Sequence, residues 1–134
     1  MFFPKSRKYR KSKKLIVKGT EHRVTDLKFG YFGLKALSNG RISSKNIETA
    51  RQAINRKIRP FGKMWVRVFA HTPISSIPSK VRMGKGKGAV SFWAGSVKKG
   101  QILYEVSGVS QSKAEEALFL GGSKLPFKTK VVKY

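Results

Sequence analysis

The sequence predicts an α+β fold, in which a mostly antiparallel or mixed sheet carries two helices and an extended basic arm precedes the domain. The chain has 134 residues, of which 40% are hydrophobic, and this suits one compact domain with an appendage. Strand-like and helix-like segments follow in the order β-β-α-β-loop-β-β-α-β, without the regular βαβα alternation of a parallel sheet. We therefore expect a basic arm over residues 1–23 and a single domain over residues 24–134.

The arm, residues 1–23, is dense in lysine and arginine. Because like charges repel, such a segment does not fold by itself, and it commonly becomes ordered against a polyanion; the alternative is a solvated tail. We expect ordering on nucleic acid. The arm cations that we expect to make these contacts are Lys5, Arg7, Lys8, Arg10, Lys11, Lys13 and Lys14.

The domain is expected to open with a strand and a turn. Within residues 26–37, the side chains of Leu27, Phe29 and Tyr31 alternate with polar or small residues, which is the period of a strand. The sequence "SNGR" at 38–41 has the composition of a turn.

The clearest helix follows the turn, between Ser43 and Pro60. Its apolar residues recur at helical spacing and form one stripe. Ser43 is the expected N-cap, with Asn46 three residues later in a weakened capping box, and Pro60 and Gly62 end the helix. The opposite face carries many cations, which indicates a phosphate-facing surface rather than a solvated one.

The later elements are expected in this order: a strand over 63–70, a loop over 71–80, a glycine-lysine loop over 81–88, strands over 89–97 and 101–106 joined by a turn at 98–101, a helix over 110–120, and a strand over 127–134. Ser112 with Glu115, or alternatively Ser110, caps the second helix, and Gly121-Gly122 ends it. The core predicted from periodicity consists of Leu27, Phe29, Leu34, Ile47, Ala50, Ile54, Ile58, Val66, Val68, Ile102, Tyr104, Leu118 and Leu125.

Charge is the strongest functional signal in the composition. Lysine and arginine number 30 against 6 acidic residues, so the formal charge is +24. A compact chain with this charge repels itself and needs an anionic partner. No apolar run approaches the roughly 20 residues of a membrane-spanning helix, which argues against a membrane partner. Nucleic acid therefore remains. Within the domain, the expected RNA-binding residues are Arg41, Arg51, Asn55, Arg56, Arg59, Lys63, Trp65 and Arg67.

The stretch "VRMGKGKG" at 81–88 alternates glycine with lysine, a pattern that suits contact with phosphate. It fails the Walker A pattern because no serine or threonine follows either lysine, and it fails G-x-G-x-x-G because position 89 is alanine. Glycines let a backbone approach a phosphate closely, and lysines add charge without a fixed geometry. We expect a nucleic-acid contact here, against the alternative of a flexible surface hairpin.

The sequence offers little for catalysis. General acid–base chemistry needs a carboxylate or histidine in a pocket, but the few acids read as helix-surface residues or ion-pair partners, Glu105 among the latter. His22 and His71 lie in loop-like sequence without a second metal ligand at suitable spacing, and the chain has no cysteine. We therefore expect no enzyme activity, no metal, no cofactor and no small-molecule substrate.

Several quoted stretches occur here in one order: "GYFGLKAL", "GRISSKNIETARQAI", "KMWVRVF", "PSKVRMGKGKG", "QILYEVSGV" and "KLPFKT". In this order they resemble the large-subunit ribosomal protein L-sixteen family of bacteria and organelles, which extends to the archaeal and eukaryotic L-ten-e proteins. The resemblance covers residues 4–130, and "VRMGKGKG" is its most specific element.

The resemblance implies an α/β-hammerhead type of fold and binding to large-subunit ribosomal RNA, with neighbouring large-subunit proteins as further partners. It implies a structural role beside the aminoacyl-tRNA site, because peptide transfer itself is RNA chemistry. The residues that it places at the functional core, next to tRNA, are Lys80, Arg82, Met83, Gly84, Lys85, Gly86, Lys87 and Gly88.

Two alternatives stay open. The segment "GQILYEVSGVS" is more similar to mitochondrial members, so we expect a mitochondrial ribosome in the matrix, with a plastid or the bacterial cytoplasm as alternatives. The alternative function is a free-standing basic RNA chaperone or other nucleic-acid-binding protein. No helix-turn-helix, zinc-finger or RNP motif supports that alternative.

Overall fold

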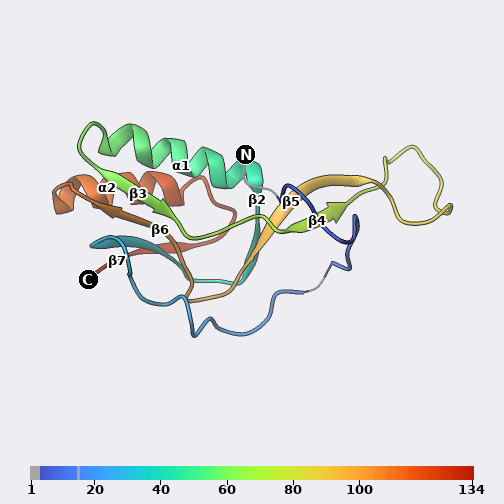
Figure 1. Cartoon of the computed structure of the whole chain (residues 1–134), viewed down its shortest axis with the longest axis horizontal. Helices are drawn as coiled ribbons and strands as arrows, with labels where there is room; N and C mark the ends of the chain where they lie inside the picture. Colours follow the sequence, from blue (N-terminus) through green and yellow to red (C-terminus); the bar gives the residue numbers. More distant parts are fainter. Residues whose placement is uncertain (1–3, 15) are drawn as a thin grey trace.

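The computed structural model describes residues 4–14 and 16–134, and it confirms an α+β fold with two helices and two antiparallel sheets. Figure 1 shows both helices over one face of the larger sheet, with a long hairpin extending to one side. The elements are β1 Phe32–Ala36, β2 Gly40–Ser43, α1 Ser44–Ile58, β3 Lys63–Val66, β4 Thr72–Ser75, β5 Val90–Val97, β6 Ile102–Ser107, α2 Gln111–Gly122 and β7 Thr129–Lys133.

The larger sheet has the strand order β3-β6-β1-β7, and the smaller sheet has the order β2-β5-β4. Neighbouring strands are antiparallel throughout both sheets. The predicted order of elements is confirmed except at two places. The turn expected at 38–41 is wrong for Gly40 and Arg41, which belong to β2 and pair with β5. The other exception is the proline-rich stretch 71–80. That stretch was expected to be a loop, but its first part, Thr72–Ser75, forms β4 because it pairs with β5.

The first helix forms as its sequence predicts. Ser43 is the N-cap, and its hydroxyl oxygen accepts a hydrogen bond from the Asn46 N–H at 3.1 Å. The apolar stripe is buried, with Ile54 at 0% and Ile58 at 2% exposure. The helix ends at Ile58, two residues before Pro60, because proline cannot continue the hydrogen-bond ladder.

The second helix begins at the second of its two predicted N-caps and ends at the predicted glycines. Its N-cap is Ser110, so the capping box expected from Ser112 with Glu115 is wrong. The helix ends at Gly122, as predicted from the Gly121-Gly122 pair, and both glycines are buried in its last turn. A Cβ added to Gly121 would come within 2.5 Å of the Ile54 side chain, so this glycine is needed where α2 packs closely on α1.

Most of the predicted core is buried between the helices and the larger sheet. The residues confirmed as buried are Leu34, Ile47, Ala50, Ile54, Ile58, Val68, Ile102, Tyr104 and Leu118. Leu27, Val66 and Leu125 are half-buried. The prediction for Phe29 is wrong, since its side chain is 58% exposed.

The strand predicted from residue 26 begins only at Phe32. The reason is that backbone N–H groups before Phe32 donate to a side chain instead of to a neighbouring strand, which the alternation of side chains does not reveal. Glu105 of β6 is fully buried, and its carboxylate accepts the N–H groups of Lys28, Phe29 and Gly30 at 3.1, 2.6 and 2.9 Å. These donors converge on one carboxylate oxygen, so this segment bends over the sheet instead of pairing within it.

Candidate nucleic-acid interface

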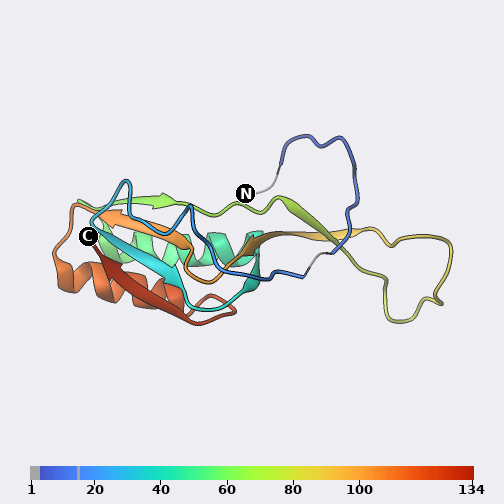
Figure 2. The same ribbon diagram turned by 90° about the horizontal axis from the view of Figure 1, so that it is seen from below.

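The glycine-lysine stretch lies at the end of the hairpin formed by β4 and β5, as the sequence predicts for a loop between two strands. Residues 80–87 are all exposed, and Met83 reaches 94% exposure. Figures 1 and 2 show the connection extending well beyond the body of the domain. A loop of this shape reaches into its surroundings without contributing to the core.

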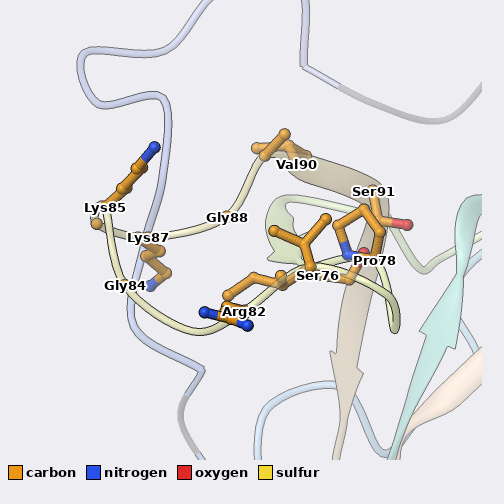
Figure 3. A pocket seen from close by; sticks show the side chains of 13 residues that line it. Ser76, Pro78, Arg82, Gly84, Lys85, Lys87, Gly88, Val90 and Ser91 are labelled. Carbon is orange, nitrogen blue, oxygen red and sulfur yellow. The ribbon is translucent and has the colours of Figure 1, made fainter.

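The backbone of this loop depends on its glycines. Gly84 and Gly86 have φ values of +124° and +87°, a region that side chains other than glycine rarely adopt, and Lys85 between them has φ +56°. A Cβ added to either glycine would meet no atom within 4 Å, so backbone conformation, not space, requires glycine here. The loop curls around an open hollow of about 380 Å³, and Figure 3 shows Arg82 and Lys85 beside it.

The N-terminal arm lies against this hairpin. Arg7 donates a hydrogen bond to the carbonyl oxygen of His71 at 2.7 Å, and its guanidinium lies 5.7 Å from the centre of the Trp93 ring. Further along the arm, Lys11 donates to the carbonyl oxygen of Lys87, and Lys87 donates to that of Ser12. Figure 2 shows the arm crossing the hairpin. The structure thus brings together two basic segments that are far apart in the sequence.

We call the described arm residues 4–14 together with residues 76–89 the arm–loop surface. Neither segment contains an aspartate or glutamate. The predicted arm cations are all exposed, and so are Lys80, Arg82, Lys85 and Lys87. Repulsion between these cations has no internal counter-charge here, so an external polyanion would stabilise the apposition. The arrangement suits phosphate contacts in particular.

A second basic surface lies on α1. Arg51, Asn55, Arg56 and Arg59 line a shallow hollow of about 320 Å³ with Gln52. Arg51 is paired with Glu48 at 2.5 Å, which raises the pKa of the guanidinium and lowers the pKa of the carboxyl group through their hydrogen bonds. The C-terminal end of α1 lies at the end of the molecule away from the hairpin loop (Figure 1). The candidate residues therefore form separate surfaces rather than one patch.

The remaining candidates differ in how accessible they are. Lys63 is exposed, whereas Arg41 and Trp65 are partly exposed. Arg67 has a side chain only 11% exposed, and it forms an ion pair with Glu105, as expected for that carboxylate from the surplus of cations. Burial raises the pKa of Glu105, but the N–H groups of Phe29 and Gly30 and the Arg67 guanidinium outweigh burial and leave this pKa lowered. The geometry thus directs the Arg67 guanidinium to the Glu105 carboxylate, a contact within the protein.

Two features of the structure could not be predicted from sequence patterns. No local signal indicates that Arg7 and Lys11 meet the hairpin, since these contacts join residues 64 and 76 positions apart. The exposure of Phe29 could not be predicted either, because the alternation of side chains indicates a buried residue there.

Among residues 4–14 and 16–134, no group of three or more histidine or acidic side chains is placed to hold a metal ion. In the same part of the chain, no helix is long and apolar enough to cross a bilayer.

Comparison with known proteins identifies the family. Residues 4–132 match the family described as "Ribosomal protein L16p/L10e". The chain is 50% identical to "Large ribosomal subunit protein uL16" of Psychrobacter arcticus over 99% of this chain and 97% of that protein. It is 48% identical to the proteins of the same name from Chelativorans sp. and Acidiphilium cryptum, over 98% of this chain and 96% of each. Because the match spans nearly every residue, including the hairpin loop, the chain belongs to the ribosomal protein L16p/L10e family.

Proposed function

We propose that the chain is a structural, non-catalytic constituent of the large ribosomal subunit that binds large-subunit ribosomal RNA and contacts neighbouring large-subunit proteins. The observation that carries this proposal is the arm–loop surface, where two basic segments without any carboxylate lie together in a chain of charge +24. Family membership supports the same role, since the relatives are named as large-subunit proteins. Phosphate contacts position the protein on RNA, and the second basic surface on α1 supplies a separate contact.

The finer part of the proposal concerns the hairpin loop, Arg82 to Gly88. We assign it a place next to tRNA at the aminoacyl site, where tRNA and ribosomal RNA phosphates are dense. Three properties support this: exposure, distance from the core, and a slim backbone with glycines at positive φ. Arg82 can make planar contacts with two phosphate oxygens, and Lys85 and Lys87 add mobile charge.

The compartment is also part of the proposal. The segment "GQILYEVSGVS" favours the mitochondrial ribosome, whereas the relatives named above come from bacteria, which fits the alternative of a bacterial ribosome. Fractionation of the source cells distinguishes the two, because only a mitochondrial protein travels with purified organelles.

Sedimentation tests the ribosomal role. A tagged chain, expressed in its own source cells at natural levels, should sediment in a sucrose gradient with large subunits and complete ribosomes. It should stay there after a wash with moderate salt and leave only when high salt weakens its phosphate contacts. A chain found mainly in the slow fractions, free or bound to assorted RNA, would contradict the proposal and support the free-standing RNA chaperone.

A further inference from the structure

An aromatic surface lies apart from the hairpin, on the face of the larger sheet opposite the helices. The Phe29 ring stacks on Trp65 of β3, with ring centres 6.0 Å apart and planes inclined by 21°. The guanidinium of Arg67 lies 5.8 Å from the centre of the Phe29 ring. Because Phe29 remains 58% exposed, these two neighbours cover only part of its ring.

The position of Phe29 is held by hydrogen bonds to the backbone around it. Its N–H donates to the fully buried Glu105 carboxylate at 2.6 Å, and the N–H groups on either side of it donate to the same oxygen. The other oxygen of Glu105 accepts from Arg67, whose guanidinium also donates to the Asp26 carbonyl at 2.6 Å. A buried carboxylate thus holds the segment that carries an exposed aromatic ring.

We propose that Phe29, supported by Trp65, is a stacking site for an unpaired base of RNA. A rigidly held aromatic ring beside cations is what single-stranded RNA recognition uses, since every base offers a π-face to stack. Exposed Lys28 precedes Phe29 in the chain, and exposed Lys63 lies two residues before Trp65 on β3, so both offer charge for the phosphates of the stacked nucleotide. The nearby carboxylates are Glu105, which is neutralised by Arg67 and backbone N–H groups, and exposed Asp26.

This inference rests on the proposed RNA-binding function but adds a second contribution to the affinity for RNA, the stacking of a base on an aromatic ring. Phosphate contacts make the affinity for RNA depend strongly on salt concentration. The contribution of base stacking depends on salt concentration only weakly. Loss of stacking should therefore lower affinity while leaving the slope of log affinity against log salt unchanged. Loss of arm cations should instead change that slope.

The test compares two labelled single strands of about a dozen nucleotides, the size range of single-strand sites. One is oligoadenylate and the other is an abasic strand with the same phosphates, and the ratio of their affinities for the full chain measures base recognition. The wild-type chain should prefer oligoadenylate. In Phe29→Leu this preference should fall roughly fivefold or more, as expected for one lost base–aromatic stack, with an unchanged salt slope.

Phe119→Leu is the matched control, because Phe119 is 73% exposed but lies on α2, near Glu115 and away from Phe29. It should keep the wild-type preference. Equal urea midpoints for the two variants exclude unfolding as the cause. An unchanged preference in Phe29→Leu, or a wild-type chain that binds both strands equally, would overturn the stacking site. Either result leaves the ribosomal role intact, since that role is judged by sedimentation.

Discussion

Replacing Glu105 with alanine should destabilise the fold far more than replacing any other acidic residue in the described part of the chain. The substitution leaves three backbone N–H groups without their acceptor and Arg67, 11% exposed, without its carboxylate. Hydrogen bonds to a charged group contribute about 1.5–3 kcal/mol each, although such values do not add within one network. Breaking a buried ion pair by removing one partner costs about 3–5 kcal/mol, and we take this as the expected loss.

The assay is urea unfolding of the full chain, followed by circular dichroism. Glu116→Ala is the control, because Glu116 also pairs with a cation, Lys57, but both side chains are about half exposed, so the loss should stay below about 1 kcal/mol. If Glu105→Ala lost no more stability than Glu116→Ala, the claim that this carboxylate holds residues 28–30 would be refuted.

The pH dependence of stability gives a second measurement on the same group. The pKa of Glu105 is lowered in the folded chain from its ordinary value of 4.5. A lowered pKa means that the folded state favours the charged carboxylate, so its contribution is complete above pH 4.5 and is lost as pH falls through the lower, folded value. The stability gap between wild type and Glu105→Gln should therefore narrow in that acidic window. A gap that stays constant there would contradict the linkage.

Three further outcomes follow from the structure. Ile54→Ala should cost about 2–5 kcal/mol in urea unfolding, because this side chain is fully buried against Gly121; a loss below about 1 kcal/mol would contradict the packing. Removing residues 1–14 should weaken binding to ribosomal RNA and flatten its salt dependence by about one unit per lost phosphate contact, while unfolding stays cooperative; an unchanged slope would make the arm a solvated tail. Arg82→Ala should slow translation in extracts while particles sediment normally, and Lys113→Ala on α2 is the control; a wild-type rate would reduce the loop to a connector.

Much of the fold could be predicted because its signals are local. The first helix carries its cap and apolar stripe within one short segment, so the residues that determine it are neighbours in the sequence. The hairpin loop and the last strand were predictable for the same reason, since glycine conformation and side-chain alternation are properties of adjacent residues. Likewise, the charge of +24 is a property of composition and by itself predicted a polyanionic partner.

Other features required the folded chain because they depend on residues distant in the sequence. The alternation around Phe29 predicts a buried strand, yet Glu105, 76 residues away, binds the backbone there and leaves the ring exposed. Gly121 is predictable as part of a helix end, but its packing role is not, because it depends on Ile54 of the neighbouring helix, which leaves no room for a side chain there.

The sequence by itself determined the class of the fold, the first helix and the anionic character of the partner. Only the tertiary structure decided which cations share a surface. Arg7 and Lys11 contact the hairpin, Arg56 and Arg59 lie at the C-terminal end of α1, and Arg67 pairs with a buried carboxylate. The physical reason is that composition fixes total charge, whereas the position and accessibility of each charge depend on long-range packing and hydrogen bonds.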